Sequence, residues 1–207
     1  TLSGIMAYTK AWTFTLGGKA PQEIEGVLVT CNYFDVLRVR PSIGTGFTQA
    51  NCAAPNAAPS VVLSHALWTR AFDADPDIVR KTIILDGQAV AVVGVAPEGF
   101  DGIDFTRAAF FASTALQQDY HKNPQLSWLT MVGRRADGSG IDEVRAELAV
   151  IASRIDRLQP GRATTLMVAP ATSLSLPVER REFLTMSAIV LAAFGLVLLI
   201  ACANVAN

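Results

Sequence analysis

The chain of 207 residues is poor in the residues that most often build metal sites and nucleic-acid surfaces. It has only 2 histidines and 3 cysteines and no Cys-x-x-Cys pair, so we expect no metal site. Its 17 basic and 18 acidic residues leave a net charge of −1, and neither sign forms a long block. We therefore expect no nucleic-acid partner.

The three cysteines lie in different surroundings. Cys202 is part of an apolar run and is interpreted as a small apolar residue. Cys31 and Cys52 could pair in an oxidising compartment, although two cysteines in unrelated local contexts are more often free. The sequence leaves their pairing open.

Motifs for phosphate and calcium binding are incomplete. The stretch Gly17-Gly18-Lys19 is followed by Ala20, where a phosphate loop needs serine or threonine. Asp75 is the middle one of three aspartates at alternate positions, but the glycine and glutamate that a calcium loop requires are missing. We expect Asp75 to cap a short turn that begins at Pro76, and we expect no cofactor.

Two side-chain pairs are candidates for catalytic groups. Ser64 and His65 are adjacent, so on a helix they point in different directions, and Ser64 is better explained as a helix cap. Asp101 and Asp104 lie in a glycine-rich loop, where solvated carboxylates are expected. Neither pair predicts catalysis.

Along the sequence, β-branched runs alternate with amphipathic segments that predict helices. This order is typical of an α/β or α+β fold. Helices are predicted after the capping residues Asn32 and Ser64, and over 141–158, where apolar residues recur at spacings of three and four in a stripe facing a core. Asp86-Gly87 predicts a hairpin turn. Strands are predicted over 5–16, 24–31, 61–63, 81–85, 89–95, 110–111, 128–134 and 164–168. The final strand-helix-strand order favours neighbouring or parallel strands in one sheet.

One long apolar run, 183–203, contains only three residues that are not apolar. As a helix it would reach about 30 Å, so it predicts a membrane span; the alternative is a buried helix. We expect the chain to be a fragment of a longer membrane protein.

Several segments, in this order, together resemble one family. They are 32–37, Val39-Arg40-Pro41 with Gly44 and Phe47, 61–65 with Trp68 and Phe72, Asp75-Pro76, Leu85-Asp86-Gly87, 92–97 with Gly99-Phe100, and 195–207. The family is that of the MacB-type periplasmic core domain of ABC transporter permeases, followed by the start of an FtsX-like permease domain.

The resemblance implies a porter-like mixed α/β domain, formed by about residues 1–44 and 126–170, with a β-rich insertion at about 45–125. Residues 1–182 would be the extracytoplasmic core domain, and 183–207 would be a transmembrane helix that starts the permease domain.

The resemblance also implies a function. A permease subunit in the bacterial inner membrane would couple ATP-driven membrane motion to the export or extraction of an amphipathic substrate. ATP would be hydrolysed on a separate ABC ATPase domain or subunit, so the chain is not expected to be an enzyme or to carry catalytic, cofactor-binding or metal-ligating residues. The other expected partners are a second permease in a homodimer or pseudo-dimer, the lipid bilayer and a periplasmic adaptor.

Two features depart from the family. Gly140 stands where relatives often have a serine cap, so the helix after it should start less firmly. Arg180 and Arg181 flank the apolar run, and the positive-inside rule would place that end in the cytoplasm. The family places it outside, and we follow the family.

Two rival functions remain: a membrane-anchored extracytoplasmic sensor or binding domain, and a membrane-anchored enzyme using Ser64 or His65. Sequence downstream of the chain would separate a permease from a sensor, and a hydrolase assay would test the enzyme.

Overall fold

A computed structural model describes residues 1–18, 20–48, 58–104, 106–117, 126–159, 161, 163–171 and 177–205. The chain divides into two compact units, Thr1–Val150 and Ile151–Asn207, which are considered separately.

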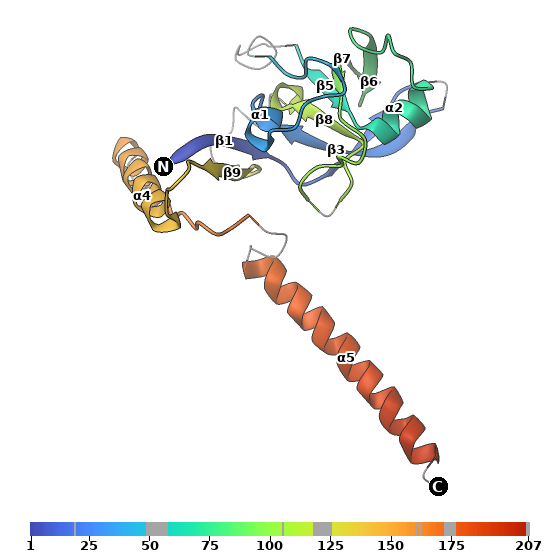
Figure 1. The fold of residues 1–207 in the computed structure, drawn as a ribbon, viewed down its shortest axis with the longest axis vertical. Helices are drawn as coiled ribbons and strands as arrows, with labels where there is room; N and C mark the ends of the chain where they lie inside the picture. Colours follow the sequence, from blue (N-terminus) through green and yellow to red (C-terminus); the bar gives the residue numbers. More distant parts are fainter. Residues whose placement is uncertain are drawn as a thin grey trace. The chain divides into compact units, whose positions relative to one another are not determined.

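The first unit is built on one nine-stranded sheet. Its strands are β1 (Leu2–Tyr8), β2 (Trp12–Leu16), β3 (Gln22–Val29), β4 (Ile43–Gly44), β5 (Ser60–Leu63), β6 (Thr82–Leu85), β7 (Gln88–Val95), β8 (Phe110–Ser113) and β9 (Thr130–Arg135). The order is β2-β6-β7-β5-β8-β3-β1-β9, with β4 paired to β7 (Figure 1). The expectation of a mixed α/β fold is confirmed.

Six of these strands close into a ring, because β2 pairs with β3 as well as with β6. The contact between β2 and β6 is short: Leu16 lies opposite Leu85, and the amide of Gly17 donates to the carbonyl oxygen of Ile84 at 2.8 Å. The ring takes strands from both sides of residue 45, where the sequence places a domain boundary. That boundary stays a prediction.

Alternating side chains of the ring strands enter two different cores. On β5, Val61 and Leu63 belong to one core and Val62 to the other. On β8, Phe110 and Phe111 divide in the same way. A strand buried on both faces has no polar alternation, which is why β5 appears in the sequence as a short apolar run.

The predicted strand 5–16 is in fact two strands. β1 ends at Tyr8 and β2 begins at Trp12. Between them Thr9 is fully buried; its amide donates to the carbonyl oxygen of Leu28 at 2.9 Å, and its hydroxyl accepts from the Leu28 amide at 3.0 Å. Thr9 is thus fixed against β3 by its side chain, a signal that strand periodicity does not contain.

The predicted short helices and hairpin are confirmed. Helix α2 (His65–Phe72) begins after Ser64, whose hydroxyl accepts from the Leu67 amide at 3.1 Å. Helix α1 (Tyr33–Leu37) follows Asn32, and a 3₁₀ turn, η2, spans Thr114–Gln117. Strands β6 and β7 are joined by Asp86 and Gly87, both with positive φ, as a two-residue hairpin turn requires.

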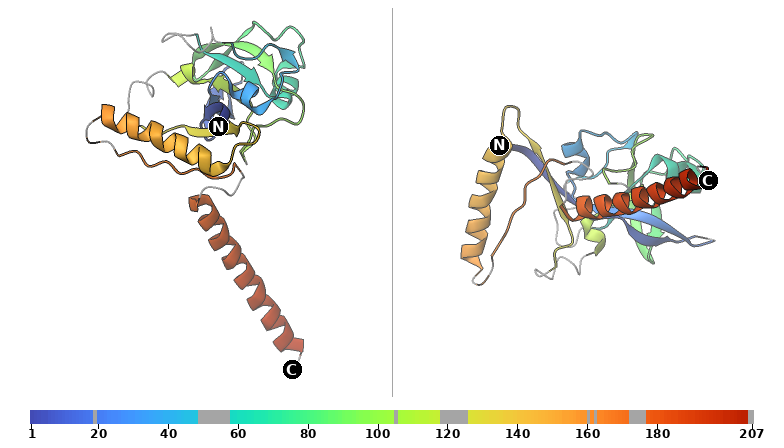
Figure 2. Two further views of the ribbon diagram at one scale, coloured as in Figure 1. Left: turned by 60° about the vertical axis from the view of Figure 1, so that its left-hand side comes forward. Right: turned by 90° about the horizontal axis from the view of Figure 1, so that it is seen from below.

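Helix α4 (Ile141–Leu158) is confirmed as a helix (Figure 2). Its apolar stripe is buried only in part. Val144 and Ala152 are buried, whereas Ile151, Ile155 and Leu158 are exposed. The prediction that the whole stripe faces a core is therefore wrong.

In the second unit the predicted strand 164–168 is wrong, because this stretch has no strand pairing. Thr164 is instead bonded to α4: its amide donates to Asp156 Oδ2 at 2.9 Å and its hydroxyl to Oδ1 at 2.6 Å. Without this strand, the predicted strand-helix-strand unit is not formed.

Helix α5 (Pro177–Val205) begins at a proline, so the charged triplet 179–181 belongs to the helix and not to a linker. Within the described part of the chain, no helix is long and apolar enough to cross a membrane. The predicted span over 183–203 is not borne out by that part.

Candidate functional site at the β1–α1–β9 junction

The most specific polar arrangement in the first unit lies where the β1/β9 pair meets helix α1. β1 runs antiparallel to β9 over most of its length, with Ile5 opposite Gly133, but it pairs with β3 only at Tyr8 opposite Val29. Further support comes from α1 and from the apolar cluster in which Met6 is buried. This junction is the place where the β1/β9 pair is joined to the ring.

Arg134 connects β9 directly to α1. Its Nε donates to the carbonyl oxygen of Val36 at 2.6 Å, and the side chain is partly buried. The last carbonyls of a helix have no partner within the helix, so a cation there satisfies a free acceptor and complements the helix dipole. A hydrogen bond from a charged donor is also stronger than a neutral one.

Asn32 and Thr30 connect β1 to the segment before α1. Asn32 Nδ2 donates to the carbonyl oxygen of Ile5 at 2.7 Å, and Thr30 Oγ1 donates to Asn32 Oδ1 at 2.9 Å. The amide of Ala7 donates to Thr30 Oγ1 at 2.9 Å. The sequence predicts Asn32 as a helix cap, but its side chain makes no capping hydrogen bond, because its Oδ1 accepts from Thr30 and its Nδ2 donates to β1.

The two elements are also in close contact. A Cβ added to Gly4 on β1 would stand 3.0 Å from Cγ2 of Val36, so any larger residue would require the Val36 side chain to shift. Val36 therefore contacts both strands: its side chain packs against β1, and its carbonyl oxygen accepts the hydrogen bond from Arg134 on β9.

An aromatic cluster also supports α1. The Tyr33 ring stacks on Phe111 with centroids 5.7 Å apart, and Phe34 packs against Phe47 at 5.9 Å and Phe100 at 5.9 Å. Burial raises the pKa of Tyr33 far above its ordinary value, with Tyr8 and then Asp104 adding to the effect. The helix is short but firmly placed by these rings.

Cys31 lies between the two hydrogen-bonding residues Thr30 and Asn32. It is half-buried and disulfide-bonded. Cys52 lies outside the described residues, and Cys202 is an exposed free thiol. The side chain that the sequence left undecided is thus covalently bound at the junction.

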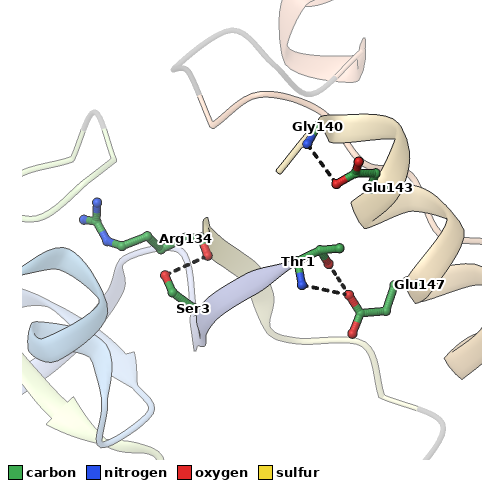
Figure 3. A network of polar contacts seen from close by, with 6 residues as sticks. All are labelled: Thr1, Ser3, Arg134, Gly140, Glu143 and Glu147. Atoms are coloured by element: carbon green, nitrogen blue, oxygen red, sulfur yellow. Dashed lines mark hydrogen bonds and ion pairs between the residues drawn. The ribbon is translucent and has the colours of Figure 1, made fainter. Parts of the chain in front are cut away.

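Farther along, the start of α4 is also held near β1 (Figure 3). The carboxylate of Glu143 accepts from the Gly140 amide at 3.2 Å, which is one half of a capping box. Glu147 accepts from the Thr1 hydroxyl, a bond that holds its pKa below the ordinary value. The weak start expected from Gly140 is thus supported by a carboxylate from the first turn.

The residues tested as catalytic or metal-binding candidates do not come together. His65 packs on Trp68 with centroids 5.3 Å apart, while Ser64 caps α2. Asp75 accepts from the Asp77 amide at 2.9 Å and from Lys81, which together lower its pKa. No group of three metal-ligating side chains occurs among the described residues. We describe no catalytic or metal site.

Sequence reasoning missed Arg134 and Thr30. The patterns over 128–134 and 24–31 predict a strand at each position and nothing more. The one available signal is the alternation of 128–134, which puts Arg134 on the same, partly buried face as Thr130 and Val132, where a charge needs an acceptor.

Two solved structures share this fold. One is the periplasmic region of MacB from Actinobacillus actinomycetemcomitans, at 15% identity and a TM-score of 0.53, with 76% of this chain and 67% of that chain covered. The other is the extracellular domain of the noncanonic ABC-type transporter YknZ from Gram-positive bacteria, at 14% identity and a TM-score of 0.55, with 78% of each chain covered. No curated protein matches the chain.

These two likenesses show a shared fold. The MacB-like periplasmic core domain family matches residues 2–151, and the chain belongs to this family. The expected family is confirmed.

Proposed function

We propose that this domain transmits movement in a permease, with the junction as the point of transmission. The observation that carries the proposal is the hydrogen bond from Arg134 on β9 to Val36 on α1, at 2.6 Å. β9 runs on along the chain into α4 and from there toward α5. A force that reaches β9 would pass to the ring through this bond. It would also pass through β1, which is linked to Asn32 by a hydrogen bond and to β3 by a single register pair.

The ring itself is suited to move as one body. It closes on itself, and its core side chains, among them Leu63, Leu85 and Phe110, are fully buried. Dense packing of this kind transmits strain instead of absorbing it. The junction combines its polar contacts with an apolar cluster, in which Met6 of β1 and Val132 of β9 pack together with Val36. Removing the polar contacts would weaken the connection between the two parts without unfolding the ring.

The finer assignments follow from the family and are proposals as well. The permease would lie in the bacterial inner membrane with this domain on the periplasmic side, and residues 183–207 would begin its permease part. An ABC ATPase domain or subunit would hydrolyse ATP, and this chain would carry no catalysis. The cargo would be an amphipathic substrate that is exported or extracted, by a permease dimer or pseudo-dimer and with a periplasmic adaptor.

The test uses the full-length permease with its ATPase in lipid nanodiscs. Hydrogen exchange is compared between the nucleotide-free complex and the complex trapped with ATP and vanadate. The proposal predicts that nucleotide changes amide protection in β9 and in the ring together. In Arg134→Ala the change should remain in β9 and disappear from the ring.

Arg107→Ala is the matched control, because Arg107 is exposed and its ion pair with Asp101 involves no residue of β9. This variant should respond like the wild type. The proposal is overturned if nucleotide leaves the protection of the whole domain unchanged, or if Arg134→Ala transmits the change as the wild type does.

A further inference from the structure

Two tryptophans, Trp12 and Trp128, stack on each other close to one end of the β1/β9 pair. Their ring centroids are 6.1 Å apart at an interplanar angle of 33°, and both side chains are partly buried. Trp12 is the first residue of β2, a strand of the ring, whereas Trp128 lies just before β9. We infer that Trp128 is a positioning residue of the proposed function: stacked on Trp12, it fixes one end of the β1/β9 pair to the ring, so that the other end moves against α1.

The end of the pair at Tyr8 is attached to the ring through the backbone. Tyr8 lies opposite Val29 of β3 on one side and opposite Thr130 of β9 on the other. Directly after it, the buried Thr9 forms two hydrogen bonds with Leu28, which is also on β3. Strand pairing and a buried, fully bonded hydroxyl hold this end in one register.

Toward its other end, β1 leaves β3, with which it pairs at Tyr8 alone among the described residues. There the β1/β9 pair contacts the α1 region through the apolar cluster around Val36 and through two side-chain hydrogen bonds, from Asn32 to Ile5 and from Arg134 to Val36. Packed side chains can slide by small amounts, whereas a strand changes register only in whole steps. The pair therefore has a fixed end and a movable end.

The tryptophan stack makes the fixed end firm. One register pair between β1 and β3 gives little resistance to sliding, and it holds only one of the two strands. Trp128 adds an attachment on the β9 side, because it packs with Trp12 against the core that contains Phe14 and Phe110. Stacked aromatic rings bury a large area in a defined geometry. With the pair kept from sliding past β3, the movement left to it is a swing of the end that carries Arg134.

Circular dichroism of the full-length permease with its ATPase in lipid nanodiscs tests the stack. Two indoles in contact couple their transitions and give two bands of opposite sign in the far ultraviolet. The same couplet should appear in the difference spectra of wild type minus Trp12→Phe and wild type minus Trp128→Phe. Trp68→Phe is the matched control, because Trp68 lies on α2 and donates to the carbonyl oxygen of Asp75, and its difference spectrum should lack the couplet.

Hydrogen exchange of the same complexes tests the role in transmission, by comparing the nucleotide-free state with the state trapped with ATP and vanadate. In the wild type and in Trp68→Phe, the Thr9 and Thr30 amides, both bonded to main-chain carbonyl oxygens, should keep their protection in both states. In Trp128→Ala, these amides should lose protection in the trapped state, and the response of the ring should fall about two-fold or more. Trp128→Phe keeps an aromatic ring on Trp12 and should respond like the wild type.

A purely structural role gives a different result. Loss of packing alone would lower protection in Trp128→Ala equally in both nucleotide states and leave the difference between the states unchanged. That result overturns the inference, as does a couplet missing from either difference spectrum, or a Trp128→Phe variant that behaves like Trp128→Ala.

The inference rests on the proposed function, and the two can be told apart. A wild type without any nucleotide response overturns the proposed function and the inference with it. A wild type that responds while Trp128→Ala responds in the same way overturns the inference alone.

Discussion

Gly26 on β3 lies directly against the ring of Phe110 on β8: a Cβ at Gly26 would stand 2.1 Å from Cζ of Phe110. The two residues are also partners in the parallel pairing of β3 with β8. Phe110 is fully buried in the core of the six-stranded ring. Its aromatic side chain therefore occupies the space that any other residue at position 26 would need.

We therefore predict that Gly26→Ala destabilises the protein by about 1–3 kcal/mol, because Phe110 must leave its rotamer or the strands must separate. Urea unfolding followed by tryptophan fluorescence measures this. Gly18→Ala is the matched control, since no atom lies within 4 Å of the added Cβ, and it should change stability by less than about 0.5 kcal/mol. Equal effects would contradict the close packing.

Arg134→Ala should lower the free energy of unfolding by about 1–3 kcal/mol, because the Val36 carbonyl oxygen loses a charged donor. Arg134→Lys should recover only part of this, since an ammonium group does not reproduce the Nε geometry. Hydrogen exchange of the first unit should show the loss at α1 and β9 first. A loss spread evenly over the ring would argue against a local junction.

Ser64→Ala should cost about 1 kcal/mol, because the Leu67 amide at the start of α2 loses its acceptor. Thermal unfolding by circular dichroism measures the change, and Ser64→Asp, which keeps an acceptor, should restore most of the loss. A variant that changed a hydrolytic activity in place of stability would revive the rival enzyme function.

We predict that the folded protein loses stability at alkaline pH because of Tyr33. Burial raises its pKa in the folded protein, so folding favours the neutral phenol. Its contribution is complete below the unfolded pKa of about 10 and is lost as the pH rises above it, by about 1.4 kcal/mol per pH unit. Tyr33→Phe should flatten this part of the profile in urea unfolding between pH 8 and 11. An unchanged profile would refute the assignment.

The extent to which the sequence predicts this fold depends on the range of the interactions involved. Asp86-Gly87, Ser64 and the apolar run at β5 act within a few residues, and the structure confirms all three. The predictions of a continuous strand through Thr9 and of a side-chain cap at Asn32 are wrong. Each side chain is hydrogen-bonded to a residue distant in sequence, Leu28 and Ile5 respectively. The periodicity of a segment does not predict hydrogen bonds to residues distant in sequence.

The candidate site was harder to predict for the same reason. Arg134 and Val36 are separated by 98 positions, and neither belongs to a motif. The lack of a complete catalytic motif in the sequence led to the expectation of a non-enzyme, and this expectation stays a prediction. It did not indicate where a permease domain would concentrate its polar contacts.

Ring closure also has a consequence for the order of folding during synthesis. Gly26 on β3 pairs with Phe110 on β8, and Leu16 on β2 pairs with Leu85 on β6. These contacts join residues far apart in sequence, which slows folding because a long loop must be closed first. Strands β1, β2 and β3 emerge early but complete their pairing only when β9, β6 and β8, respectively, have been made. The nascent chain therefore passes through a stage with unpaired strand edges, which are prone to aggregation.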